Sequence, residues 1–252
     1  MGSKMTPLNL DSFMNQQWED LLLLHWAIPE DVIRNSIPDD LEIDLFENQA
    51  WVSVVGFRLT GLRIRPIRWL EWGEFNEVNL RTYVRDRMGR KGVWFHSLDS
   101  CDLFSVIGAK LLYGLNYRYA TIERRKTSQS ILYQSSLRSF SVKTTSRLEA
   151  QIDTCKKQNP QASEPIDHFL LERYRFWSNR KWANRSHSAS VRHKPYNAVR
   201  LQNSNYQGSL FSCHNLPEPE AKPTLAHFCE GFPVTASAPS WVYDIAGQAN
   251  QI

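Results

Sequence analysis

Polar and apolar residues alternate most regularly in F-N-E-V-N-L-R-T-Y-V, from Phe75 to Val84. With the two-residue period of a strand, one face carries Glu77, Asn79, Arg81 and Tyr83, and the other carries Val78, Leu80, Thr82 and Val84. If the apolar face lies on a core, the polar residues are solvated. If the strand belongs to a small barrel, the polar residues could line its cavity, and the period alone does not decide between the two.

The same patterns predict strands along most of the chain and three short helices. The predicted strands cover residues 41–46, 50–60, 75–84, 93–98, 117–124, 130–135, 137–143, 188–193 and 225–228, after an apolar segment at 18–28. Helices are predicted over 29–38, over 102–113 between an Asp102 N-cap and a Gly114 C-cap, and over 164–173, begun by Ser163 and Pro165. The polar stretch 146–163 is predicted to be a solvated excursion.

Many short strands with few helices and no strand–helix–strand rhythm predict an α+β domain on an antiparallel sheet or barrel. We expect one domain over residues 17–245, an N-terminal extension at 1–16 and a C-terminal tail at 246–252. The 252 residues are 42% hydrophobic and 12% aromatic, which is enough for a sizeable core.

The charge is only mildly basic, +4 from 30 basic and 26 acidic residues, which is compatible with anionic small molecules. The longest early apolar run, Leu21–Leu24, is far shorter than the roughly 20 residues that span a bilayer, so we expect no membrane partner. No signal-peptide pattern precedes it, and the four cysteines are scattered without a C-x-x-C pair. These features predict a cytoplasmic protein with free thiols.

Common catalytic templates are absent from the sequence, including phosphate-binding glycine loops, H-E-x-x-H and G-x-S-x-G. Cys213-His214 and His227-x-Cys229 could ligate a metal, but adjacent residues on an extended chain point in opposite directions. We therefore expect no metal and no cofactor.

Two basic, aromatic segments could bind macromolecules. Residues 173–194 interleave arginines and lysines with Trp177 and Trp182, but without a recognised motif we expect no nucleic acid. The loop Arg63–Arg68 with Trp69 and Trp72 leaves an interaction module as a weaker alternative.

The predicted hairpin of strands 75–84 and 93–98 is the main candidate site. The second strand would add His96, or Ser97 and Asp99, depending on register. A carboxylate and a guanidinium on one face could hold a ligand in a dry pocket, or could form an ordinary ion pair on an exposed sheet.

Seven blocks of sequence resemble the YqjF-like family, also called domain of unknown function 2071. The blocks are H-W-A-I-P-E, L-E-I-D-L-F-E-N-Q-A-W-V-S-V-V-G-F, E-V-N-L-R-T-Y-V, G-V-W-F-H-S-L-D, A-K-L-L-Y-G-L-N-Y-R-Y-A, L-E-R-Y and V-R-H-K-P-Y. They run in order from about Gln17 to Val242. The resemblance implies a fold like that of acetoacetate decarboxylase, a cone-shaped antiparallel β-barrel with flanking helices and an internal cavity.

The resemblance does not imply the decarboxylase activity. Glu77 matches the cavity-facing acid of the decarboxylases, but their Schiff-base lysine and its lysine neighbour correspond here to Tyr117 and Arg118. A phenol cannot form an imine. Lys110, on the preceding predicted helix, would need to enter the cavity to replace the missing lysine.

We therefore expect a cavity that binds a small organic acid or carbonyl compound, in a chain that could form a homo-oligomer. Arg81 would clamp an anion, Asn79 and Arg118 would line the cavity, and Tyr117 would donate a hydrogen bond to a carbonyl. The alternative is a lyase or hydrolase that uses no imine, with Glu77 as acid or base and with Tyr117 and Arg118 stabilising an enolate or oxyanion.

Overall fold

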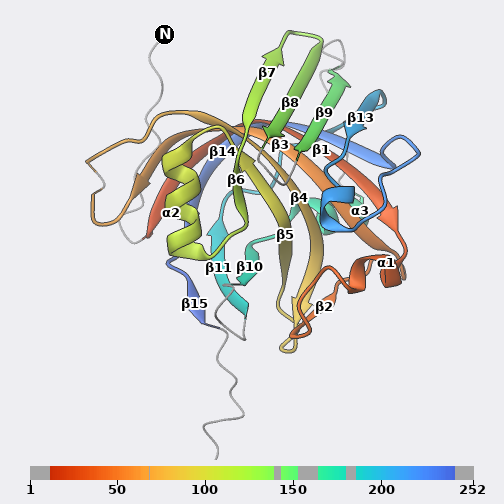
Figure 1. The fold of residues 1–252 in the computed structure, drawn as a ribbon, viewed down its shortest axis with the longest axis horizontal. Coiled ribbons are helices and arrows are strands. Elements are labelled where there is room, and N and C mark those ends of the chain that lie inside the picture. The colour runs from red at the N-terminus through yellow and green to blue at the C-terminus, as the bar shows by residue number, and fades with distance from the viewer. Residues whose placement is uncertain (1–11, 68, 139–142, 153–163, 180–185, 242–252) are drawn as a thin grey trace, which may run out of the picture.

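A computed structural model describes residues 12–67, 69–138, 143–152, 164–179 and 186–241. In these ranges the chain is mostly sheet, and its helices are short (Figure 1). None of the described helices combines the length and apolar composition that crossing a bilayer requires. The mostly-sheet prediction with a few helices is confirmed.

The larger sheet is a curved layer built mainly from long strands. Its principal strands are β1 (Met14–Ile28), β3 (Ala50–Ile64), β4 (Phe75–Asp86), β5 (Lys91–Ser100), β10 (Arg175–Asn179), β11 (Ser186–Arg192) and β14 (Leu225–Ala236). Short strands β2 (Leu41–Ile43), β6 (Tyr117–Tyr119), β12 (Val199–Arg200) and β15 (Ser240–Trp241) pair with them. Their order is β12-β14-β1-β3-β4-β5-β10-β11-β15, with β2 on β4 and β6 on β5. β11 also pairs with β14, so the pairings return to the start of the path.

A smaller antiparallel sheet packs on one face of the larger one (Figure 1). It contains β7 (Thr121–Lys126), β8 (Ser130–Arg138), β9 (Lys143–Gln151) and β13 (Ser204–Gly208), in the order β13-β9-β8-β7. The helices are α1 (Glu30–Arg34), α2 (Leu103–Tyr113), α3 (Pro165–Leu171) and a 3₁₀ turn, η1 (Ser212–His214).

Both faces of the larger sheet are buried, and each face has its own core. Leu22 and Leu24 of β1 pack with Tyr133 and the other apolar residues of the smaller sheet. Leu21 and Leu23 point the other way, into a second core with α2, α3 and β14. The run Leu21–Leu24 is therefore part of a strand that is buried on both sides.

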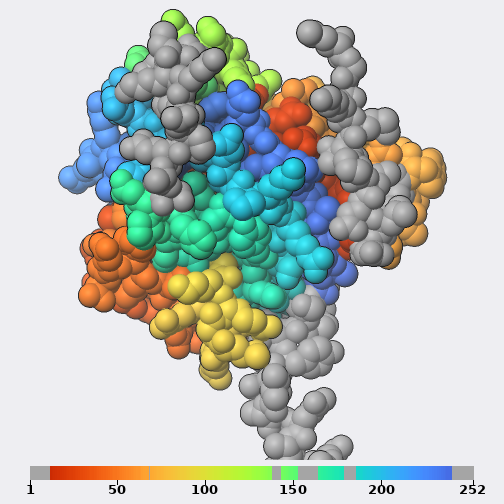
Figure 2. Space-filling view, turned by 180° about the vertical axis from the view of Figure 1, so that it is seen from behind, coloured from red at the N-terminus to blue at the C-terminus, as the bar shows by residue number. Residues whose placement is uncertain are grey.

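Helix α2 begins and ends as the sequence predicts. The Asp102 carboxylate accepts a hydrogen bond from the Ser105 amide at 2.6 Å, and Gly114 ends the helix at a φ of 65°, which favours glycine. The helix lies beside β6, in front of the larger sheet (Figure 1). From behind, α3, β10 and β11 occupy the middle of the molecule, above the β4–β5 hairpin (Figure 2).

Several predicted elements differ from the observed ones. The strand predicted at 137–143 is wrong, because β8 continues to Arg138 and β9 starts only at Lys143. The start of the predicted polar excursion is also wrong, because residues 146–151 belong to β9. Strand 117–124 is split into β6 and β7 at Ala120, and the N-cap of α3 is Glu164; Ser163 lies outside the described residues.

Candidate functional site

The alternating strand predicted at residues 75–84 is β4, and both of its faces are buried. Val78 and Leu80 are fully buried against the core shared with the smaller sheet. On the opposite face Glu77, Asn79 and Arg81 are 2%, 2% and 7% exposed. The choice between a solvated and an enclosed polar face is thus resolved: the polar side chains are enclosed.

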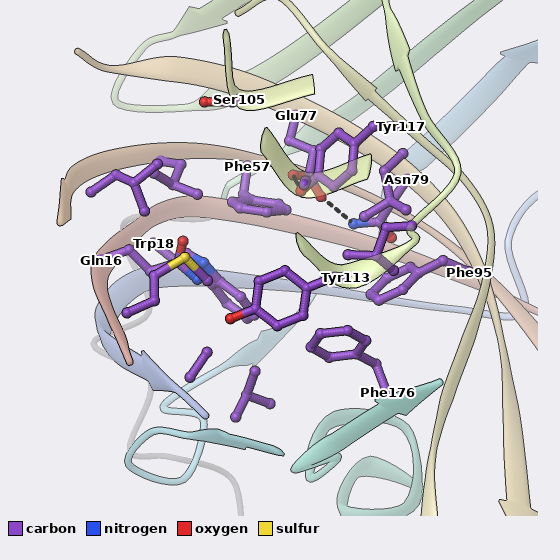
Figure 3. A pocket seen from close by; sticks show the side chains of 18 of the residues that line it. Gln16, Trp18, Phe57, Glu77, Asn79, Phe95, Ser105, Tyr113, Tyr117 and Phe176 are labelled. Carbon is purple, nitrogen blue, oxygen red and sulfur yellow. Dashed lines mark hydrogen bonds between the residues drawn. The ribbon is translucent and has the colours of Figure 1, made fainter. Parts of the chain in front are cut away.

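These three polar residues line a pocket between the sheet and α2. Figure 3 shows Glu77 and Asn79 in its wall. Its walls are mostly apolar, and its free volume is about 150 Å³. The aromatic walls come from β1, β3, β5, α2 and β10, through Trp18, Phe57, Phe95, Tyr113 and Phe176. Residues 104, 105, 108, 109 and 112 of α2 complete the wall near the opening.

Glu77 lies at the centre of a short hydrogen-bonded cluster inside the pocket (Figure 3). The Tyr117 hydroxyl donates to one carboxylate oxygen at 2.6 Å, and the Asn79 amide donates to the other at 3.1 Å. Tyr117 reaches the pocket because β6 runs parallel to β5, with Tyr117 beside Leu98, another residue of the pocket wall. The structure thus brings Glu77, Asn79 and Tyr117 into direct contact.

Burial dominates the ionisation of this cluster. It raises the pKa of Glu77 from 4.5 to about 7, although the hydrogen bonds from Tyr117 and Asn79 favour the carboxylate and partly oppose the shift. Burial and the neighbouring Glu77 raise the pKa of Tyr117 well above 10. Near neutral pH Glu77 can therefore release or accept a proton, while Tyr117 remains a hydrogen-bond donor.

Arg81 is a buried cation without a carboxylate partner among the described residues. One terminal nitrogen donates to the Leu170 carbonyl at 3.5 Å, and its Nε has no hydrogen-bond partner in the described ranges of the chain. By contrast, the buried Arg173 nearby is paired with Asp44 at 2.6 Å. A guanidinium held out of water without a counter-charge favours the binding of an anion.

Arg118 does not line the pocket, so its expected place there is wrong. Its Nε and one terminal nitrogen donate to the two oxygens of Asp99 at 2.6 and 3.0 Å, and its other terminal nitrogen donates to the Cys213 sulfur. The cause is strand alternation: Tyr117 points into the pocket, so the next residue points to the opposite face, beside Asp99.

The predicted partners from β5 are replaced by apolar residues. Leu98 lies opposite Asn79, which puts Ser97 and Asp99 on the other face, and a bulge after Leu80 shifts the register so that Phe95 instead of His96 lies opposite Arg81. His96, Ser97 and Asp99 therefore do not line this pocket. A bulge is not visible in the alternation of either strand by itself.

No lysine among the described residues lines the pocket. Lys110 is exposed on the outer side of α2, so it does not replace the missing Schiff-base lysine within the pocket. The sequence does not identify the aromatic residues of the pocket wall. A high aromatic content is typical of cores and of pockets, and it does not show which rings lie in a core and which line a pocket.

The other sequence candidates are placed apart from this pocket. His227 contacts Asp167 and His25 inside the protein, whereas Cys213 and His214 lie in η1, beside a second cavity that also contains His96. The described residues contain no group of three or more acidic, histidine or cysteine side chains suited to a metal ion. Of the basic segment 173–194, Arg173 and Trp177 are buried, and Trp182 lies outside the described residues.

Comparison with solved structures defines the fold class. The chain resembles acetoacetate decarboxylase from Legionella pneumophila with a TM-score of 0.62 at 12% identity, over 97% of this chain and 94% of that one. It resembles an acetoacetate decarboxylase-like enzyme from Sphingomonas wittichii with a TM-score of 0.60 at 12% identity, over 96% and 100%. The enduracididine biosynthesis enzyme MppR, complexed with pyruvate, gives a TM-score of 0.60 at 10% identity, over 96% and 93%. The fold is therefore similar to that of acetoacetate decarboxylase.

Within this fold class the chain belongs to the DUF2071 family of uncharacterized conserved proteins, which it matches over residues 15–233. It is 30% identical over 216 residues to the uncharacterized protein YqjF of Bacillus subtilis, covering 84% of this chain and 86% of that protein. The family resemblance carried by the sequence blocks is confirmed.

Proposed function

We propose that this protein binds a small organic acid or carbonyl compound in the pocket beside β4. The observation that carries the proposal is the buried Arg81, which lines the pocket and has no carboxylate partner among the described residues. The planar guanidinium of Arg81 can donate two parallel hydrogen bonds to a carboxylate. A bound anion would also compensate the positive charge of Arg81, which burial has removed from water. The pairing of β11 with β14 connects the two ends of the strand order, and this supports a cone-shaped barrel around the ligand.

A thermal-shift screen with small carboxylates tests this proposal. Ligands should raise the melting temperature of the wild-type protein, and Arg81→Met should abolish the shifts because it removes the cation and retains most of the bulk. Arg85→Met is the matched control, since Arg85 lies on the same strand but pairs with Glu42 on the surface. If Arg81→Met retains every ligand shift, Arg81 is not the anion clamp.

The proposed function does not include imine chemistry. Tyr117 stands where the resemblance implies the nucleophilic lysine, and no described lysine lines the pocket. Borohydride reduction in the presence of acetoacetate should therefore leave the mass of the protein unchanged. A stable adduct on Lys110 or on any other lysine would overturn this part of the proposal.

The contact between Glu77 and Tyr117 favours a second candidate, an enzyme that moves a proton next to a carbonyl. Glu77 has a pKa of about 7, so its carboxylate could remove a proton from the carbon next to the carbonyl. As Glu77 becomes protonated, the Tyr117 hydroxyl, which donates to Glu77 in the structure, would turn its hydrogen to the developing enolate oxygen. Exchange of the C3 hydrogens of a 2-oxo acid in D₂O, followed by NMR, tests this. Exchange should be lost in Glu77→Gln and reduced in Tyr117→Phe; exchange that is unaffected by Glu77→Gln would exclude Glu77 as the base.

A further inference from the structure

We propose that the ligand is a monocarboxylic acid with an aromatic or branched apolar body, held by its carboxylate at Arg81 and by its body among the aromatic walls. This inference rests on the proposed function and adds the class of ligand. It follows from the walls, the unpartnered polar atoms and the charges of the pocket.

The walls are suited to an apolar body. Around the polar residues of β4 the pocket is lined by aliphatic and aromatic side chains of both the sheet and α2, and five of them are seen encircling it in Figure 3: Trp18, Phe57, Phe95, Tyr113 and Phe176. A free volume of about 150 Å³ is comparable to an engineered apolar cavity that accepts benzene. A ligand as small as acetate would leave most of these walls uncovered.

Several residues of the lining carry buried polar atoms without a hydrogen-bond partner, and these indicate what kind of polar group the ligand would supply. Within the part of the chain that the structure describes, buried atoms without a hydrogen-bond partner occur on five residues of the lining: the Nε1 atoms of Trp18 and Trp72, Asn79 Oδ1, Arg81 Nε and Ser105 Oγ. Three of these are donors only, one is an acceptor, and the serine hydroxyl can be either. A lining with more free donors than acceptors matches a ligand rich in acceptors, such as a carboxylate or an oxo acid.

The charged residues in the lining select one carboxylate rather than two. They are Glu77, Arg81, Arg173 and Arg175. Arg173 is already neutralised by Asp44, and a terminal nitrogen of Arg175 donates to the Ser188 hydroxyl at 3.1 Å. A second carboxylate would have to reach Arg175, in competition with the Ser188 hydroxyl; anywhere else it would lie among aromatic rings or beside Glu77, where desolvation and repulsion disfavour it. Repulsion by the Arg81 guanidinium likewise disfavours a ligand that carries an ammonium group next to its carboxylate.

A homologous series of acids tests the proposed class by isothermal titration calorimetry. From acetate to hexanoate, affinity should rise about fourfold per methylene until the pocket is full, and 3-phenylpropanoate should bind at least tenfold more tightly than acetate. Succinate should bind no more tightly than acetate. Binding of every acid should be lost in Arg81→Met.

A pair of matched variants on α2 tests whether the body occupies this pocket. Ala109 lines the pocket, so Ala109→Phe should fill it and weaken 3-phenylpropanoate at least tenfold while sparing acetate. Leu111→Phe is the control, because Leu111 is 69% exposed and does not line the pocket. Circular dichroism and melting temperature show that each variant is folded.

The outcomes separate the ligand class from the proposed function. Arg81-dependent binding that is equally strong for acetate, succinate and 3-phenylpropanoate would overturn the apolar body and leave the proposed function intact. Absence of binding by every acid would overturn both. Chain-length dependence that Ala109→Phe does not change would show that the body lies elsewhere, which also overturns the inference.

Discussion

Glu77 shows how the environment of a single residue gives it a chemical property that its type does not. The alternation of strand 75–84 predicts that Glu77 shares a face with Asn79 and Arg81, and the family resemblance favours that face being inside. The pKa of about 7 depends on the depth of burial and on two hydrogen bonds, which are formed by tertiary packing. The sequence of the strand alone does not predict how strongly burial and these two hydrogen bonds shift the pKa of Glu77.

The raised pKa of Glu77 predicts a dependence of stability on pH. Because the folded-state pKa lies above the unfolded-state value of 4.5, the contribution of Glu77 to stability is fully present below pH 4.5 and is lost as pH rises through about 7. Glu77→Gln carries no such titration. From pH 4.5 to 8, its free energy of unfolding should therefore rise relative to that of the wild-type protein by about 3 kcal/mol.

Urea unfolding at several pH values measures this difference. Glu42→Gln is the control, because Glu42 is an exposed carboxylate in a surface ion pair. A constant difference between Glu77→Gln and wild type over the whole range would show that Glu77 is ionised normally in the folded protein.

At the scale of elements, sequence patterns predict those segments whose signals are local. Helix α2 is predicted with both of its caps, because Asp102 and Gly114 act through neighbouring backbone groups. Strand β9 is missed, because its buried face includes the small polar residues Thr144 and Ser146, so the hydrophobic alternation disappears. The β4–β5 bulge is missed because it depends on how two strands pair.

The link between β5 and β6 gives a prediction about Arg118. Burial raises the pKa of Asp99, while Arg118 opposes that shift through a paired contact on the face away from the pocket. Arg118→Met leaves Asp99 buried without its cation, so we expect a loss of about 3–5 kcal/mol in the free energy of unfolding. Ligand binding by the folded fraction should remain unchanged, because Arg118 does not line the pocket.

A double variant separates the ion pair from general damage to β6. Adding Asp99→Asn to Arg118→Met should recover a large part of the lost stability, since the unpaired charge is then removed. Additive losses in denaturant unfolding would contradict the paired role. Loss of ligand binding in a folded Arg118→Met protein would instead return Arg118 to the site.

At the scale of the molecule, the pocket exists because two cores lie on opposite faces of one sheet. The core with the smaller sheet fixes the apolar face of β4, and this fixes the polar face toward α2. The family resemblance anticipates this fold class, whereas composition and alternation leave a sheet and a barrel equally open. The position of the smaller sheet depends on contacts between residues far apart in the chain, so local patterns do not reveal it.

At Gly56 the larger sheet lies close against Tyr133 of the smaller sheet. A Cβ atom at Gly56 would lie 2.7 Å from the Tyr133 ring, and the Tyr133 hydroxyl is held by the Asp20 carbonyl at 2.9 Å. Gly56→Ala should therefore separate the sheets and lower the free energy of unfolding by about 1–3 kcal/mol. At Gly73 a Cβ atom meets nothing within 4 Å, so Gly73→Ala should cost less than 0.5 kcal/mol, about the range of ordinary surface changes.

Denaturant unfolding of the two glycine variants compares these effects directly. The polar residues of the pocket lie on the neighbouring strand, since Gly56 pairs with Val78 of β4. Displacement of β3 by Gly56→Ala should therefore also weaken ligand binding, although Gly56 does not line the pocket. Equal stability of both variants would show that Tyr133 moves aside at little cost. It would also contradict our explanation that the packing of the two cores on opposite faces of the sheet holds the polar face of β4 toward α2.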